Sequence, residues 1–272
     1  MKMWKNAIAP IWFAVAVIGL VCSVRAETPV AAVPVAKTPE LMLYCGAGIR
    51  PAAEALIQAF ESNRNVKVVA AYGGSGQVLG QLTASKQGDL FMPGEAFYVE
   101  KAVSAGLADP ASRRDFAWFI PTIIVQKGNP LGVTGLRDLA EKNLRVGLGD
   151  ERAVAVGRKS VELFQTNGIP MEAVLKHVML KSGTVNELGV AIETKNIDAA
   201  IVWDATARQF AKSADEVVIP LAQNIVTPIP VVRLKFSQHP DLAAAFIQFV
   251  ASEEGRRILT SQHYTVSRPQ SR

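Results

Sequence analysis

Cysteine and histidine are scarce in this 272-residue sequence, and their scarcity excludes several kinds of site. Of the two cysteines only Cys45 follows the first 26 residues, so no disulfide framework is expected. Cys45 is expected to pack as a small hydrophobic side chain. The three histidines have no acidic or cysteine partner nearby in sequence, and no H-E-x-x-H or C-x-x-C pattern occurs. The sequence therefore predicts no metal site and no cofactor.

Nucleotide-binding and nucleophile motifs are also missing, although a glycine-rich stretch, YGGSGQ, begins at Tyr72. No lysine follows its glycines as a Walker A loop requires, and Gly74, Gly76 and Gly80 are spaced one residue too widely for a dinucleotide fingerprint. The G-x-S-x-G nucleophile elbow is absent around Ser75, because Gln77 stands where the motif requires its second glycine. A secreted hydrolase using Ser75 remains an alternative, but no motif places a base beside it.

The first 26 residues have the pattern of a secretory signal peptide. A basic start, MKMWKN, precedes an apolar run and a small-x-small cleavage site that ends at Ala26. An uncleaved membrane anchor is the alternative. A lipoprotein would be modified at Cys22, but Val21 is a poor residue before such a cysteine. Residues 27–38 are rich in proline and small residues and predict a flexible spacer.

The basic charge of the whole chain belongs largely to the predicted signal peptide. Removing residues 1–26 removes Lys2, Lys5 and Arg25 and no acidic residue, so the formal net charge falls from +5 to +2. No basic stripe follows one element, and no nucleic-acid partner is expected.

Strand and helix patterns alternate along the rest of the chain, which is 49% hydrophobic over its whole length. Strand-like runs at 41–45, 66–72 and 89–93 are each followed by a helical pattern, at 51–63, 76–87 and 96–107. This order predicts an α/β fold with a parallel sheet and helices on both faces. A second set spans 144–203, and residues 240–262 are purely helical in pattern.

Two extended, proline-broken segments, 116–130 and 217–234, separate these sets. They indicate two lobes, each with its own parallel-rich sheet, joined by two crossings. We expect residues 39–118 and 224–272 to form the first lobe and residues 119–223 the second. One continuous doubly wound sheet is the alternative.

Four glycine-containing turns each precede a predicted helix: YCGAGIRP and YGGSGQ in the first lobe, GLGDERAVAVG and KSGTVNE in the second. Such a turn exposes unpaired backbone N–H groups at the positive end of a helix dipole, which can hold an anion without a charged side chain. Neighbouring parallel strands end at one edge of a sheet, where ligands bind in open α/β folds. The four turns together predict one site for a small anion.

These residues resemble the periplasmic molybdate-binding proteins, the receptors of ATP-driven oxyanion importers. The resemblance runs from about Leu41 to about Thr265, and its clearest parts are YCGAGIRPAAEALIQAFE, YGGSGQVLGQL, GDLFMPGEAFYVEKAVSAGL and DAAIVWDATA. It implies a type 2 periplasmic binding fold that closes by hinge motion around a tetrahedral anion held by neutral donors. It also implies a periplasmic location, an inner-membrane permease of the ABC class as partner, and no catalytic residues. We expect a monomer.

The resemblance also places ligand positions on this chain. The family's first ligand serine falls on Gly48, with Ala47 beside it, and its second falls on Ser75, with Gly74 beside it. Backbone contacts fall near Val156, with Ala155 beside it, and on Val185. The family's ligand tyrosine falls on Trp203, which can donate through its ring nitrogen but cannot accept. The changes at 48 and 203 leave the anion open among molybdate, tungstate and smaller oxyanions.

Three charged residues suggest alternatives near this site. Arg50 either reaches the cleft, where it suits a carboxylate or a sulfate- or phosphate-like anion, or points to solvent. Asp204 either contacts the ligand or lines the hinge, and Glu95 is expected to cap a helix. Ferric receptors of this fold use adjacent tyrosines, and none of the four tyrosines here are adjacent.

Overall fold

The computed structural model describes residues 38–62 and 64–270 of the chain. The predicted signal peptide and all but the last residue of the predicted spacer lie outside this part. No helix within the described ranges has the length and hydropathy that a membrane crossing needs.

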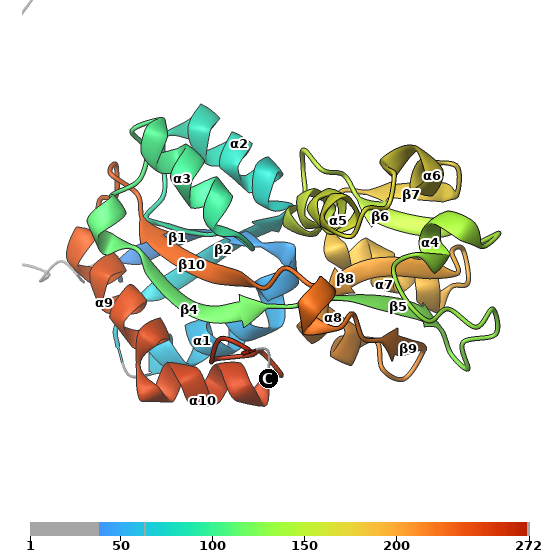
Figure 1. Ribbon diagram of the computed structural model, residues 1–272. Helices are drawn as coiled ribbons and strands as arrows, with labels where there is room; N and C mark the ends of the chain where they lie inside the picture. The colour runs from blue at the N-terminus through green and yellow to red at the C-terminus, as the bar shows by residue number, and fades with distance from the viewer. Residues whose placement is uncertain (1–37, 63, 271–272) are drawn as a thin grey trace, which may run out of the picture. The chain divides into compact units, whose positions relative to one another are not determined.

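Residues 38–270 form two five-stranded sheets, which define two lobes (Figure 1). The first lobe's sheet has the order β2-β1-β3-β10-β4 and the second lobe's sheet the order β7-β6-β8-β5-β9. The first sheet contains β1 (Glu40–Gly46), β2 (Lys67–Gly73), β3 (Leu90–Met92), β4 (Arg114–Phe119) and β10 (Thr227–Arg233). The second contains β5 (Pro121–Gln126), β6 (Val146–Gly149), β7 (Val178–Ser182), β8 (Ala199–Trp203) and β9 (Ala214–Val217). The two-lobed α/β fold expected from the sequence is confirmed.

Strand direction changes at the proline-broken segments. β1 pairs in parallel with β2 and β3, and β6 pairs in parallel with β7 and β8. β10 is antiparallel to β3 and β4, and β5 is antiparallel to β8 and β9. β5 and β10 are the strands through which the chain arrives from the other lobe, so their direction is set by the crossing.

Helices cover the faces of both sheets, as the alternating pattern predicts. In the first lobe α2 and α3 lie on one face and α1, α9 and α10 on the other (Figure 1). The first lobe holds α1 (Arg50–Ser62), α2 (Ser75–Ser85), α3 (Ala96–Ser104), α9 (Pro240–Ala251) and α10 (Glu253–Ser261), with short 3-10 turns η1 (Ala47–Ile49) and η2 (Pro110–Ser112). The second holds α4 (Asp138–Glu141), α5 (Ala155–Thr166), α6 (Met171–Leu175), α7 (Val185–Glu193) and α8 (Asp204–Gln209), and the turn η3 (Leu221–Gln223) lies between β9 and β10.

The C-terminal segment, which the sequence predicts to be helical, consists of two helices. α9 ends at Ala251, and Ser252 has extended backbone angles. The Ser252 hydroxyl accepts a hydrogen bond from the Gly255 N–H and caps α10. A Cβ on Gly255 would meet the Val250 and Phe249 carbonyls, so α10 packs directly against the end of α9.

Asp204 lies beside the segment where the chain passes from the first sheet to the second. The chain passes between the sheets at Ile120, whose N–H donates to Asp204 Oδ1 at 3.2 Å and whose carbonyl accepts from the Asp204 N–H at 2.8 Å. Asp204 Oδ2 accepts from Arg208 and from the Thr265 hydroxyl, at 3.1 and 3.0 Å. One buried carboxylate thus ties the crossing strand, α8 and the C-terminal segment together.

Candidate functional site

A small pocket lies where the two lobes meet, at the carboxyl ends of β1, β2, β4 and β8. Its lining consists of uncharged residues: Gly46, Ala47, Gly48, Ile49, Gly73, Gly74, Ser75, Gly94, Phe119, Val154, Ala155, Val185 and Trp203. The space open to the centre of a water-sized sphere is only about 10 Å³, which is close to what one ordered water requires. In this arrangement of the lobes the pocket therefore has room for about one water molecule.

Four helix starts contribute to this lining. Ala47 to Ile49 form the turn η1 that leads into α1, Ser75 begins α2, Ala155 begins α5 and Val185 begins α7. The first N–H groups of a helix have no partner within it and lie at the positive end of its dipole. Two lobes thus present backbone donors to one small volume, which is an arrangement that attracts negative charge.

The hydroxyl of Ser75 is oriented by a neighbouring backbone group. The Gly94 N–H donates to Ser75 Oγ at 3.0 Å, and Ser75 is 3% exposed. A hydroxyl that accepts this bond keeps its own proton for another acceptor. Ser75 is therefore set to donate a hydrogen bond into the pocket.

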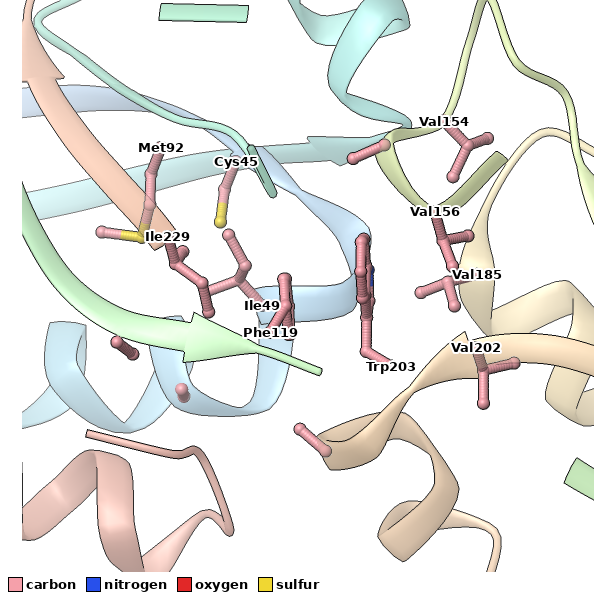
Figure 2. Close-up of a cluster of buried hydrophobic side chains, with 14 of the residues drawn as sticks. Cys45, Ile49, Met92, Phe119, Val154, Val156, Val185, Val202, Trp203 and Ile229 are labelled. Carbon is pink, nitrogen blue, oxygen red and sulfur yellow. The ribbon is translucent and has the colours of Figure 1, made fainter. Parts of the chain in front are cut away.

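Trp203 closes the pocket beside Gly48. Its ring stacks on Phe119, with centroids 4.6 Å apart and planes 5° apart, and Figure 2 shows it edge-on between Phe119 and the side chains of Val156 and Val185. A Cβ on Gly48 would lie 2.9 Å from Val185 Cγ1 and 3.1 Å from Trp203 Cδ1. Trp203 and Val185 therefore occupy the room that a side chain at position 48 needs.

The carbonyl of Gly48 is also held. Tyr264 Oη donates to it at 2.6 Å, and the Tyr264 ring lies 5.9 Å from that of Phe119. Because the peptide plane is rigid and its N–H opposes its C=O, this bond also fixes the direction of the Ile49 N–H. Tyr264 of the C-terminal segment thus holds the turn η1 in place by a hydrogen bond.

Two of the three glycines of YGGSGQ, Gly74 and Gly76, are explained by the approach of the second lobe's backbone. A Cβ on Gly74 would lie 2.7 Å from the Gly183 carbonyl oxygen, and one on Gly76 would meet the Arg152 carbonyl oxygen more closely than any real Cβ does. The Gly76 N–H donates to the Ala153 carbonyl at 2.9 Å. Only glycine lets the two main chains come this close.

The predicted ligand positions are distributed as follows. Ala47, Gly48, Gly74, Ser75, Ala155, Val185 and Trp203 all line the pocket. Val156 is fully buried one residue further along α5, and its place in the lining is taken by Val154. Arg50 and Asp204 lie outside the lining.

Arg50 is directed along its own helix. Its Nε bonds Glu54 at 2.8 Å, its side chain is 60% exposed, and its guanidinium lies 5.1 Å from the centre of the Tyr72 ring. The bond to Glu54 and its charge raise the pKa of Arg50. In this arrangement Arg50 gives no support to a carboxylate ligand.

The expectation that Glu95 caps a helix is wrong. Glu95 stands at the start of α3, but its side chain makes no capping hydrogen bond. It is buried and pairs instead with Arg158 and Lys159 of α5, in the other lobe. The hydrogen bonding of the Arg158 guanidinium, which donates to the Glu95 carboxylate, is the largest cause that raises the pKa of Arg158.

Three residues outside the four glycine-containing turns were missed by sequence reasoning. Gly94 and Phe119 line the pocket, and Tyr264 supports it. Phe119 is the last residue of β4 and directly precedes the crossing, so its place at the edge of the sheet was available as a signal. Nothing in the local sequence connects Tyr264 with Gly48, which lies 216 residues earlier.

Comparison with known proteins agrees with this geometry. Residues 41–265 match the family model described as bacterial extracellular solute-binding protein. The chain belongs to this family.

Two curated relatives and one solved structure are similar to this chain. A binding protein of Haemophilus influenzae is 28% identical over 226 residues, covering 83% of this chain and 90% of the relative. The molybdate-binding protein ModA of Mycobacterium bovis is 25% identical over 248 residues, covering 90% and 92%. The sulfate-binding protein SubI of Mycobacterium tuberculosis has a TM-score of 0.74 at 19% identity, covering 83% of this chain and 86% of that one, and shows the fold alone.

The pocket chemistry is consistent with a binding protein. Among the described residues there is no group of three or more histidine, cysteine or acidic side chains that could hold a metal ion. The lining has no histidine and no carboxylate that could act as a base toward Ser75.

Proposed function

We propose that this protein is the periplasmic receptor of an ABC importer and that it captures a small tetrahedral oxyanion, molybdate or tungstate, between its lobes. The observation that carries the proposal is the uncharged pocket, lined by four helix starts with Ser75 and Trp203 as side-chain donors. The relatedness to a ModA protein supports molybdate as the ligand. In this role the protein binds and delivers its ligand and catalyses no reaction.

The donor set suits a fully ionised oxyanion. Backbone N–H groups, the Ser75 hydroxyl and the Trp203 indole N–H all donate, and no carboxylate in the lining can accept a proton from the ligand. A protonated oxyanion such as hydrogen phosphate would find no carboxylate acceptor in the lining for its O–H, and an unpaired donor costs binding energy. Selection among ionised anions then depends on pocket size.

Capture requires movement of the lobes. Lining residues come from both lobes, so the ligand completes contacts that neither lobe provides alone. Binding that uses both lobes stabilises the closed arrangement over an open one. The crossings at Ile120 and between β9 and β10 are where we place the hinge.

A melting-temperature panel tests the proposal. The purified protein is heated with molybdate, tungstate, sulfate, phosphate, arsenate, ferric citrate and simple carboxylates. A ligand at about 1,000 times its dissociation constant adds roughly 4 kcal/mol, which for a protein of this size raises the melting temperature by roughly ten degrees. We expect this rise with molybdate and tungstate.

Other outcomes reassign the ligand. A rise with sulfate alone would mean that Trp203 and Gly48 fit the pocket to a smaller anion. A rise with carboxylates alone, abolished in Arg50→Gln, would replace the oxyanion proposal with the arginine-based one. No rise with any member of the panel would refute an oxyanion receptor.

A further inference from the structure

A charged cluster joins the two lobes beside the pocket. The Glu95 side chain, which belongs to the first lobe, is only 3% exposed. Arg158 Nε donates to its Oε2 at 3.0 Å, and a second Arg158 nitrogen contacts Oε1. Lys159 Nζ lies 3.2 Å from Oε1 and is itself 9% exposed. Both cations belong to α5 of the second lobe. The ion-pair partners of the buried Glu95 carboxylate therefore come from the other lobe.

The cluster is adjacent to the pocket without lining it. Gly94, the residue before Glu95, lines the pocket and donates its N–H to Ser75. Ala155, at the start of the helix that carries Arg158 and Lys159, also lines the pocket. None of the three charged side chains belongs to the lining. The ion pairs of the cluster therefore form only when the two walls of the pocket are close together. Their side chains are not in the pocket lining.

The energetics of the cluster depend on closure. A buried carboxylate is costly unless it is paired and hydrogen-bonded. In the closed arrangement Arg158 and Lys159 of α5 pair with the Glu95 carboxylate. When the lobes separate, Glu95 loses both of these partners at once. The Arg158 guanidinium also lies 4.3 Å from the centre of the Phe97 ring in α3, which adds a second contact across the cleft.

We propose that Glu95, Arg158 and Lys159 form a positioning cluster that holds the lobes closed and sets how long the bound anion is retained. The proposal rests on the function proposed above and adds a determinant of ligand release that lies outside the ligand's contacts. An ion pair that forms only after closure acts on dissociation and leaves the encounter rate largely unchanged.

The test is Glu95→Gln, followed by stopped-flow tryptophan fluorescence with molybdate. We expect the dissociation rate to rise roughly 30-fold or more and the association rate to change less than about threefold, because breaking one side of a buried charge pair acts on release. Glu100→Gln is the matched control, since Glu100 is on the same helix with a side chain that is 66% exposed. Arg158→Gln should reproduce the effect from the other lobe and serves if Glu95→Gln does not fold.

An unchanged dissociation rate in both variants would overturn the proposal. So would an equal fall in the melting temperature of the unliganded protein and of the complex, since that marks a general packing role. If the wild-type protein binds no anion of the panel, the proposed function fails, and small-angle X-ray scattering of the unliganded proteins decides the role of the cluster. A larger radius of gyration in Glu95→Gln than in the wild type would support the cluster as a closure contact, and equal radii would refute it.

Discussion

The Gly76 N–H donates to the carbonyl of Ala153 across the two lobes, at an N–O distance of 2.9 Å. This bond joins the second residue of α2 to the loop before α5. Its donor is therefore used to fasten the lobes and is not available to a ligand. Gly76 is a closure residue, whereas Ser75 beside it faces the pocket.

Gly76→Ala should impair closure and leave the separate lobes intact. The new Cβ would meet the Arg152 carbonyl oxygen and lie 3.2 Å from Ala153 Cα, both backbone atoms that cannot turn away. We expect anion affinity to fall at least tenfold, about 1.4 kcal/mol. The unliganded protein should be as stable as the wild type or more so, since alanine is favoured over glycine in a helix by roughly 0.5–1 kcal/mol. Calorimetric titration and thermal unfolding measure the two quantities.

Gly80→Ala is the control for that experiment. Gly80 lies in the same helix, and a Cβ there would have nothing within 4 Å. It should gain the same helix stability with unchanged affinity. Equal affinities for the two variants would mean that the approach at Gly76 does not limit closure.

Ser75→Ala should weaken anion binding by roughly 1.5–3 kcal/mol, the range for a hydrogen bond to a charged group. The substitution also leaves the Gly94 N–H without its partner. Isothermal titration calorimetry measures the loss. Thr83→Ala is the matched control, because Thr83 is an exposed residue of the same helix whose hydroxyl bonds only Leu79. If Ser75→Ala binds as tightly as Thr83→Ala, Ser75 is not a ligand donor.

Trp203→Phe should keep the stack on Phe119 and remove the indole donor. Loss of that donor is expected to cost roughly 1.5–3 kcal/mol of binding energy. The wild-type protein should also change its fluorescence on binding, because Trp203 lines the pocket. That change should disappear in Trp203→Phe while the signal of Trp118 remains. A fluorescence response that survives the substitution would place the reporting tryptophan elsewhere.

Gly48→Ala should reduce affinity, and Val185→Ala should partly restore it. The Cβ on Gly48 would lie 2.9 Å from Val185 Cγ1, so shortening Val185 makes room for it. We expect the double variant to bind more tightly than Gly48→Ala alone, by about 1 kcal/mol, as residues in direct contact couple. A double-mutant cycle with titration calorimetry gives the coupling. Additive losses would show that Val185 does not set the room at position 48.

Asp198→Asn should lower stability at neutral pH and flatten its acid dependence. Hydrogen bonds donated by the Arg145 side chain lower the pKa of Asp198 below its ordinary value. Burial acts in the opposite direction, and a hydrogen bond from the Arg145 backbone N–H lowers the pKa further. Its contribution is therefore present above the ordinary aspartate pKa, about 3.9, and is lost as the pH falls through the lower pKa of the folded state. Because the Arg145 side chain is 47% exposed, the contribution should be about 1 kcal/mol at most.

Urea unfolding at a series of pH values below 5 measures this contribution. Glu216→Gln, an exposed residue of β9, is the control and should leave the profile unchanged. A profile for Asp198→Asn that runs parallel to the wild type down to pH 2 would show that the Arg145 bond contributes no acid dependence.

Local patterns were enough to predict the lobes and the loops that meet. The four glycine-containing turns stand between strand and helix patterns, and parallel strands bring such turns to one edge, so their convergence followed from topology. The crossing at Ile120 could be anticipated because proline at 121 interrupts an otherwise continuous apolar run.

Contacts between distant segments could not be predicted. Glu95 has its partners 63 and 64 residues later in another lobe, so its local pattern indicated a helix cap. The partner of Arg50, in contrast, is close in sequence, because Glu54 lies one helical turn away and forms an ion pair with it. The family resemblance placed a backbone contact near Val156, whereas Val154 and Ala155, at the start of α5, line the pocket.

Apart from the Ser75 hydroxyl and the Trp203 indole N–H, the polar groups of the pocket lining belong to the main chain. A point mutation can remove a side chain but leaves a peptide N–H in place, so this recognition surface is resistant to loss by substitution. Divergence in ligand preference within such a scaffold must then arise from the residues that set the volume, here Trp203, Val185 and Phe119. A lineage could exchange one oxyanion for another by altering these walls, while the helix starts that attract the charge stay unchanged.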